Sequence, residues 1–185
     1  MSTLMVRAFV AFEVSDGMRT GFAAAQDVLR GCSARLTFVD PRLIHVTVKF
    51  LGEVDEKKIP QVMAALKTVK AAPFTVDGIT ITVNSRRNPR TVWCAMDDHG
   101  KGREVFAAVE NVLAPLGFAR ETRDYLSHAT LARVREADPS LFSALDKLKD
   151  FPCGSCTVAG IKLKKSTLTR AGPVYEDLME AAWQA

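Results

Sequence analysis

The sequence predicts an α+β fold built largely from antiparallel sheet. Apolar, β-branched segments of strand length are interspersed with amphipathic helical segments, roughly in the order β-α-β-β-α-β-β-α-β-α-β. No linker or low-complexity stretch divides the 185 residues, which suffice for a sizeable core. Two strand segments, one in each half of the chain, also share the pattern His-x-Thr. We therefore expect residues 1–185 to form one cooperative unit.

The expected elements are separated by short connections. In chain order they are a strand at 4–14, a helix between Ser15 and Gly31, strands at 34–38 and 44–52, a helix from Asp55 to about 69, strands at 74–83 and 91–96, a helix at 102–116, a strand at 128–134, a helix after Asp138-Pro139, a strand at 158–169 and a short C-terminal helix after Gly172-Pro173.

Capping residues mark the expected helix starts. Ser15, Asp55 and Asp138 each precede apolar residues at helical spacing, and Pro139 suits a first helical turn. Gly31 is expected to end the first helix.

Changes of periodicity mark the strands. The segment 74–83 alternates apolar and polar residues, but its period slips near Gly78, which indicates a bulge or a turn. Gly52 is expected to end the first His-x-Thr strand. In the last strand, Ile161 and Leu163 alternate with lysines, which is typical of a half-buried strand.

The two His-x-Thr segments carry the clearest functional signal. Residues two apart on a strand point the same way, so His45 and Thr47 should leave one face together, as should His128 and Thr130. A single such motif means little. Two of the chain's three histidines, however, occur in these matching contexts. Two imidazoles facing one cleft can act as general acid and general base near neutral pH. The third, His99, is expected in an exposed turn.

These paired motifs resemble the 2H phosphoesterase superfamily, and more closely the RNA 2′,3′-cyclic phosphodiesterase family, also called 2′-5′ RNA ligases. The resemblance extends over most of the chain and is carried by residues 7–12, 45–53, 86–93, 116–118, 128–134 and 172–176. Two departures stand out. Ser127 occupies a position where that family often has proline, and residues 36–38 replace a stretch that typically contains an aromatic residue.

The resemblance implies a fold and a reaction. The fold is a pair of lobes related by a pseudo-twofold axis, with helices outside and a central cleft lined by the two His-x-Thr strands. The reaction is metal-independent hydrolysis of an RNA or nucleotide 2′,3′-cyclic phosphate to a 2′-phosphate, and reversible 2′-5′ ligation is compatible with the same chemistry. We assign His45 as the acid and His128 as the base, although the two motifs are nearly interchangeable in sequence. The alternative is a non-catalytic protein that binds RNA ends or nucleotides in the same cleft.

Further residues are expected to bind the substrate. Thr47 and Thr130 can donate hydrogen bonds to the non-bridging phosphate oxygens. Phe50 and Arg133 lie five residues after each histidine, where strict alternation points them away from it. If a bulge reverses them, Phe50 can stack on a base and Arg133 can contact phosphate or base; otherwise they are a core phenylalanine and a surface arginine. Lys49 nominally shares the histidine face and is expected to be a solvated lysine at its rim.

Composition limits the remaining possibilities. The chain is 48% hydrophobic and 25% charged, as in ordinary globular proteins, and its net charge of +4 suits a phosphate-bearing partner. Cys153 and Cys156 form a lone CxxC without a second pair, so we expect reduced thiols and no zinc. No signal peptide or membrane segment is recognisable. We expect a cytoplasmic monomer that needs no cofactor or metal and acts on RNA ends or nucleotides bearing a 2′,3′-cyclic phosphate.

Overall fold

The computed structural model describes residues 4–170 and 172–184. The helices and strands within these ranges are β1 (Met5–Glu13), α1 (Asp16–Leu29), β2 (Arg35–Phe38), β3 (His45–Asp55), α2 (Ile59–Lys67), β4 (Phe74–Val83), β5 (Thr91–Asp97), α3 (Lys101–Leu113), β6 (His128–Glu136), α4 (Pro139–Lys147), β7 (Ser155–Val158), β8 (Gly160–Thr169) and β9 (Gly172–Ala182). None of these helices is long and apolar enough to cross a membrane.

All nine described strands belong to one sheet, and each pair of neighbours is antiparallel. The strand order is β7-β4-β5-β6-β3-β1-β8-β9, and β2 pairs with residues 132–136 of β6, beyond the single pairing of β6 with β3. The two strands that carry the histidines, β3 and β6, are therefore neighbours at the centre of the sheet. The predicted α+β class with antiparallel sheet is confirmed.

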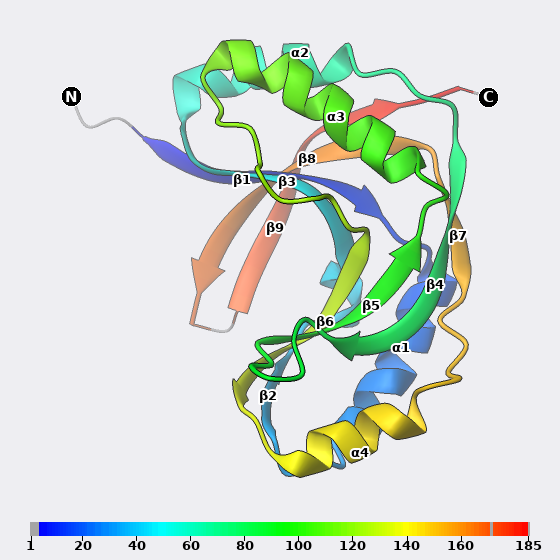
Figure 1. The fold of residues 1–185 in the computed structure, drawn as a ribbon. Coiled ribbons are helices and arrows are strands. Elements are labelled where there is room, and N and C mark those ends of the chain that lie inside the picture. The colour runs from blue at the N-terminus through cyan, green and yellow to red at the C-terminus, as the bar shows by residue number, and fades with distance from the viewer. Residues whose placement is uncertain (1–3, 171, 185) are drawn as a thin grey trace.

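The sheet has two similar lobes that meet between β3 and β6. One lobe contains β6, β5, β4 and β7, and the other contains β3, β1, β8 and β9. Helices α1 and α4 pack together on the first lobe, while α2 and α3 pack together on the second. Figure 1 shows these helix pairs at opposite ends of the molecule. Matching strands and helices are thus related by a pseudo-twofold axis at the junction, as the family resemblance implies.

The chain crosses between the lobes, so a lobe is not one half of the sequence. Strand β1 lies in the β3 lobe, yet the helix that follows it, α1, contacts α4 and β6 of the other lobe. Strand β5 lies in the β6 lobe, and its following helix α3 contacts α2 and β3. Neither lobe can be completed by half of the chain, and folding as one cooperative unit stays a prediction.

The predicted helix caps form as expected, with one refinement. The Ser15 hydroxyl accepts a hydrogen bond from the Met18 amide (3.3 Å), and the Asp138 carboxylate accepts one from the Ser140 amide (2.8 Å). Asp55 caps a 3₁₀ turn (Glu56–Lys58) that leads into α2 rather than the α-helix itself. Side-chain acceptors therefore satisfy first-turn amides at each predicted start.

Three details of the predicted elements are wrong. The expected C-terminal helix is strand β9, which pairs with β8 along its whole length from Gly172 to Ala182. Its Glu, Leu, Met and Ala residues favour a helix, but pairing with β8 and burial of Met179 and Ala181 outweigh this weak preference. Strand β3 does not end at Gly52, which adopts φ 71° within it. Strand β7 is not predicted, because its four residues are too few to show a period.

Candidate active site

The register between the two central strands fixes the arrangement of the site. Val46 of β3 lies opposite Ala129 of β6, and both side chains face the core, with exposures of 2% and 0%. Because side chains alternate along a strand, the residues on either side of this pair project from the opposite face.

Four polar side chains form a two-by-two block on that face. Continuing the register by one residue in each direction places His45 opposite Thr130 and Thr47 opposite His128. All four are half-buried. The two histidines occupy one diagonal of the block, where neighbouring residues are typically about 7–8 Å apart. The sheet thus brings together the four residues that the paired motifs single out.

Both imidazoles are held in the same way, by a carbonyl two residues earlier in the segment that leads into the strand. Nδ1 of His45 lies 2.7 Å from the Leu43 carbonyl oxygen, and Nδ1 of His128 lies 2.8 Å from that of Leu126. A carbonyl oxygen only accepts, so Nδ1 carries the hydrogen in each ring. The neutral form of each imidazole therefore presents an unprotonated Nε2 to the site, and the charged form presents an Nε2–H donor.

Aromatic side chains from neighbouring strands enclose the two imidazoles. The Phe9 ring of β1 stacks on His45 with centroids 4.8 Å apart, and the Tyr175 ring of β9 meets the same imidazole edge-on at 5.5 Å. Trp93 of β5 lies against His128 at 4.3 Å. These contacts fix the ring planes and exclude water from one side of each histidine.

Burial lowers the pKa of both histidines. For His45 it is the largest effect; the Leu43 carbonyl opposes it, the nearby Lys164 charge lowers the pKa further, and Glu13 raises it. For His128, burial again lowers the pKa most, and the Leu126 carbonyl opposes it. The guanidinium of Arg133 adds to the lowering of that pKa. Both groups are thus neutral at a lower pH than a free imidazole would be.

Two matching bulges reverse the side chains that follow the histidines. The pairing of β1 with β3 skips Val48, and the pairing of β5 with β6 skips Leu131, each three residues after its histidine. The bulges return Phe50 and Arg133 to the histidine face, so the bulge that their predicted substrate contacts require is present.

Phe50 and Arg133 are both accessible on this face. The Phe50 side chain is 67% exposed, and its ring centroid lies 6.0 Å from that of Phe9. The Arg133 guanidinium donates to the Thr91 hydroxyl (3.1 Å). Phe50 is therefore not a core phenylalanine, which was the expected alternative. Strict strand alternation fails for both Phe50 and Arg133.

The expectation for Lys49 is wrong. The bulge at Val48 turns its side chain to the far face, where Nζ lies 2.5 Å from Glu110 of α3 and donates to the Ala119 carbonyl (2.8 Å). The Lys49 and Glu110 side chains are only 7% and 5% exposed. Lys49 is therefore a buried structural residue and not a solvated lysine at the rim of the site.

Ser127 supports the segment that holds His128, a contact that cannot be found in the sequence pattern. Its hydroxyl donates to the buried Asp98 carboxylate and lies 3.2 Å from the Tyr125 hydroxyl. The same carboxylate accepts a bond from the Gly100 amide (2.9 Å). Ser127, the residue that departs from the resembled family, is therefore anchored by its side chain, and this anchor holds the adjoining Leu126 carbonyl in place beside His128.

An ionic cluster beside His45 is also missed by sequence reasoning, because its members come from four separate elements. Glu13, opposite His45 in the β1–β3 register, pairs with Arg19 and with Lys164, at 2.5 Å each. Lys164 also pairs with Asp177 at 2.6 Å. Charges of both signs therefore lie near His45, whereas His128 of the other lobe lies opposite the uncharged Ala95.

Other sequence features lie outside the block. The basic loop 84–90 contacts α4, where the Arg86 guanidinium lies 5.0 Å from the Phe142 ring centroid. The Cys153 thiol donates to the Phe151 carbonyl oxygen (3.4 Å), and all four cysteines are free thiols. The exposed His99 bonds Asp77 (2.8 Å), which raises its pKa.

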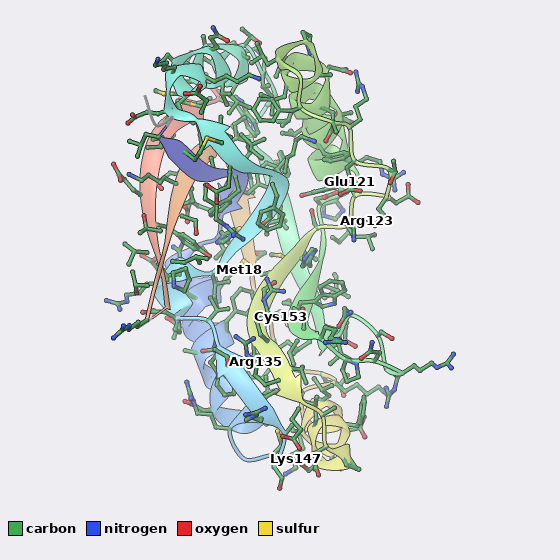
Figure 2. The ribbon with its side chains drawn as sticks, turned by 90° about the vertical axis from the view of Figure 1, so that its left-hand side faces the viewer. Met18, Glu121, Arg123, Arg135, Lys147 and Cys153 are labelled. Carbon is green, nitrogen blue, oxygen red and sulfur yellow. The ribbon has the colours of Figure 1, made fainter. Side chains whose placement is uncertain are left out.

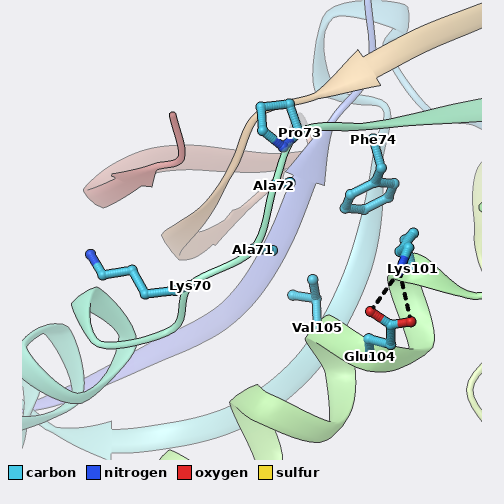
Figure 3. Close-up of a pocket in the computed structure, with 8 residues that line it drawn as sticks. All are labelled: Lys70, Ala71, Ala72, Pro73, Phe74, Lys101, Glu104 and Val105. Atoms are coloured by element: carbon cyan, nitrogen blue, oxygen red, sulfur yellow. Dashed lines mark hydrogen bonds and ion pairs between the residues drawn. The ribbon is translucent and has the colours of Figure 1, made fainter. Parts of the chain in front are cut away.

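Two further features lie apart from the histidines. Figure 3 shows a recess lined by 70–74 and by three residues at the start of α3, with Lys101 bonded to Glu104 at 3.0 Å. Glu121 and Arg123 lie on the segment that leads into β6 (Figure 2) and form an exposed pair, which lowers the pKa of Glu121 to about 2. Within 4–170 and 172–184, no three His, Cys, Asp or Glu side chains are grouped so that they could hold a metal ion.

Comparison with known proteins shows extended similarity. The family model of LigT-like phosphoesterases matches residues 13–93 and 99–175. A protein of Archaeoglobus fulgidus named RNA 2′,3′-cyclic phosphodiesterase is 33% identical over 175 residues, which cover 94% of this chain and 98% of the relative. A protein of the same name from Methanocaldococcus jannaschii is 32% identical over 177 residues, covering 95% and 99%.

Solved structures share the fold. The crystal structure of Escherichia coli LigT complexed with 3′-AMP superimposes with a TM-score of 0.79 at 21% identity, covering 98% of this chain and 100% of LigT. The crystal structure of the Thermus thermophilus protein TT0787 gives a TM-score of 0.77 at 23% identity, covering 95% and 97%.

Proposed function

The chain belongs to the LigT-like phosphoesterase family, and from this premise we propose that it hydrolyses RNA or nucleotide 2′,3′-cyclic phosphates to 2′-phosphates. The names of the relatives support the substrate class. The observation that carries the mechanism is the block in which His45 and His128, each bonded through Nδ1 to a carbonyl, lie diagonally beside Thr47 and Thr130.

Two imidazoles supply both proton transfers of the reaction. A water oxygen attacks phosphorus while the neutral Nε2 of one histidine takes its proton. The bond from phosphorus to the 3′-oxygen breaks on the opposite side, and the imidazolium Nε2–H of the other histidine protonates that oxygen. The product is a 2′-phosphate with a free 3′-hydroxyl, and exchange with solvent restores the two starting protonation states. Because Nδ1 stays bonded to a carbonyl, only Nε2 changes protonation.

The neighbouring side chains supply binding and charge stabilisation. The hydroxyls of Thr47 and Thr130 donate to the non-bridging oxygens as negative charge develops. The exposed Phe50 ring stacks on the nucleobase, and Arg133 contacts the phosphate or the base. No step of this mechanism needs a metal ion.

The same steps allow ligation as a secondary activity. If the 5′-hydroxyl of a second RNA replaces water, its oxygen attacks phosphorus and the 3′-oxygen leaves as before. The product is a 2′-5′ linkage, and the reverse reaction regenerates the cyclic phosphate. The exposed Phe50 ring offers a stacking surface for a base of either strand.

The test is an assay of the purified protein with 2′,3′-cyclic AMP and with an RNA ending in a 2′,3′-cyclic phosphate, both in excess EDTA. The expected product is the 2′-phosphate, identified by chromatography against 2′- and 3′-phosphate standards. A 3′-phosphate product or loss of activity in EDTA would contradict the mechanism. Binding of cyclic-phosphate RNA without turnover would instead support the alternative of a non-catalytic binding protein.

A further inference from the structure

Tyr175 joins the candidate site from the last strand of the sheet. Its ring meets Phe9 edge-on at 5.1 Å and His45 at 5.5 Å, and the residue is half-buried. Its hydroxyl forms no hydrogen bond with any residue in 4–170 or 172–184. The proposed hydrolysis gives this phenol no role, so a free donor lies beside the histidine face.

Arg7 and Ser166 lie in the same row as Tyr175. Ser166 of β8 pairs directly with Tyr175 of β9, and continuing the β1–β8 register by one residue from Ala8–Lys165 places Arg7 opposite Ser166. Arg7 shares a face of β1 with Phe9, two residues on, whose ring stacks on His45. A guanidinium, a hydroxyl and a phenol therefore form a row across three adjacent strands on the histidine side.

The charges around this row favour an anion. Burial raises the pKa of Tyr175, while the charges of Arg133, Arg7 and Lys164 lower it, so three cations lie near the phenol. Lys164 is already paired with Glu13 and Asp177. In the described part of the chain, Arg7 and Arg133 form no ion pair, although Glu53 lies opposite Arg7 in the β1–β3 register. The Ser166 hydroxyl, like that of Tyr175, forms no hydrogen bond with a residue in the described part of the chain. Two guanidiniums without ion pairs and these two hydroxyls suit a phosphate.

The spacing from the histidine block suits a second phosphate of the same substrate. Arg7 lies two residues beyond Phe9 along β1, a distance of about 7 Å. The exposed Phe50 ring lies beside Phe9, between this row and the block. A nucleotide whose cyclic phosphate sits at the histidines and whose base stacks on Phe50 would direct its 5′ side toward Arg7.

We propose that Arg7, Ser166 and Tyr175 form a second phosphate subsite, which binds the phosphate on the 5′ side of the terminal nucleotide. The proposal rests on the proposed hydrolysis of a 2′,3′-cyclic phosphate and names its substrate more closely: an RNA 3′ end or a 5′-phosphorylated nucleotide, in preference to a cyclic nucleotide with a free 5′-hydroxyl.

The test compares four substrates that share one cyclic-phosphate end. They are a cyclic mononucleotide, its 5′-phosphorylated form, a dinucleotide, and the same dinucleotide with a neutral methylphosphonate in place of its internal phosphate. We expect kcat/KM to be about tenfold higher for the charged dinucleotide than for the methylphosphonate, the effect of one charge-assisted contact at an exposed site. The 5′-phosphorylated mononucleotide shows whether a terminal phosphate is bound as well as an internal one.

Variants of the subsite test which residues bind the second phosphate. Arg7→Gln should remove the difference between the charged and the methylphosphonate dinucleotide, with kcat/KM for the methylphosphonate unchanged. Ser166→Ala and Tyr175→Phe should each reduce the ratio of kcat/KM for the charged dinucleotide to kcat/KM for the methylphosphonate. Arg103→Gln, which removes an exposed arginine from α3 on the other side of the sheet, is the matched control and should leave this ratio unchanged.

Each outcome decides the proposal. Equal rates for the two dinucleotides, or an undiminished ratio in Arg7→Gln, would overturn the subsite while leaving the proposed hydrolysis in place. If no cyclic phosphate is hydrolysed, the proposed function fails, and the subsite is judged by calorimetry with dinucleotide 2′-phosphates. Tighter binding of the charged form than of the methylphosphonate by the wild type, lost in Arg7→Gln, would support the subsite, and equal binding would overturn it.

Discussion

Lys49 and Glu110 form a buried ion pair behind the strand that carries the first histidine. The pair joins β3 to α3, and Lys49 also bonds the Ala119 carbonyl at the start of the segment that leads to the second histidine. Breaking a buried pair by removing one partner leaves an uncompensated charge, whereas replacing both with apolar residues is often neutral.

Lys49→Met should therefore lower the free energy of unfolding by about 3–5 kcal/mol. The double variant Lys49→Met/Glu110→Leu should recover most of that loss. Urea denaturation measures both effects. Because Lys49 faces away from the block, kcat measured well below the melting temperature should stay close to the wild-type value. A stable Lys49→Met protein with a greatly reduced kcat would instead show that the Lys49 side chain acts on the face that carries the histidines.

Ser127→Ala should weaken both stability and turnover. The change leaves the buried Asp98 carboxylate without one donor, an effect of about 1.5–3 kcal/mol on unfolding. It also frees the Leu126 carbonyl that holds His128, so kcat should fall with little change in KM.

Ser127→Thr, which keeps the hydroxyl, is the matched control and should restore kcat. A purely structural role for Ser127 would lower stability in the alanine variant without separating kcat from KM. In that case the hydrogen bond to Asp98 does not position His128.

The strongly periodic parts of the fold could be predicted from the sequence. Caps such as Ser15 and Asp138, helical stripes and the slip at Gly78 are local signals, and the β4–β5 register does shift at Gly78. Strand β9 could not be predicted, because its helix-forming residues are held in a strand only by pairing with β8.

The residues of the site could be predicted where a sequence motif is repeated, but not where their positions depend on the pairing of strands. The two His-x-Thr motifs identify themselves by duplication. The bulges at Val48 and Leu131, however, arise from strand pairing and reverse the side chains that directly follow them. This is why strict alternation misplaces Lys49, and why the contacts of Ser127 and Tyr175, made by residues distant in sequence, leave no local pattern.

Activity should follow a bell-shaped pH profile with its centre on the acid side of a free imidazole. The reaction needs one imidazolium and one neutral imidazole, and the pKa of each histidine lies below its usual value near 6.5. As pH rises above both values the acid is lost, and as pH falls below both the base is lost. The two limbs of kcat/KM belong to the coupled pair.

The bound substrate should displace this profile. A cyclic phosphate anion stabilises the imidazolium, so the kcat bell should lie at higher pH than the kcat/KM bell. Stopped assays in buffers of constant ionic strength measure both. An optimum of kcat/KM at or above about pH 8, or a profile with a single limb, would contradict paired histidine catalysis with lowered pKa values.

Arg133→Ala should separate substrate binding from packing. Loss of the guanidinium should raise KM, and it should also raise the pKa of His128, whose lowering it reinforces. The corresponding limb of the pH profile should therefore move to higher pH. Phe50→Ala, at the matching position of the other strand, should raise KM without moving that limb. Unchanged KM and pH profile in Arg133→Ala, with lower thermal stability alone, would show a structural role.

Replacing the histidines tests whether they share the proton transfers. His45→Ala and His128→Ala should each lower kcat for a 2′,3′-cyclic nucleotide by about 10²–10⁴-fold, the usual effect of a positioned acid or base. The double variant should lose less than the product of the single losses, because the two groups act in one reaction step. Thr47→Val and Thr130→Val remove one donor each and keep the proton path, so their effects should be smaller.

Circular dichroism and melting curves establish that each variant is folded. This control is needed because Phe9 and Trp93 lose an aromatic neighbour when the imidazoles are removed. A folded single variant with near-wild-type kcat would refute the two-histidine mechanism, because no other group of the two-by-two block can exchange a proton near neutral pH.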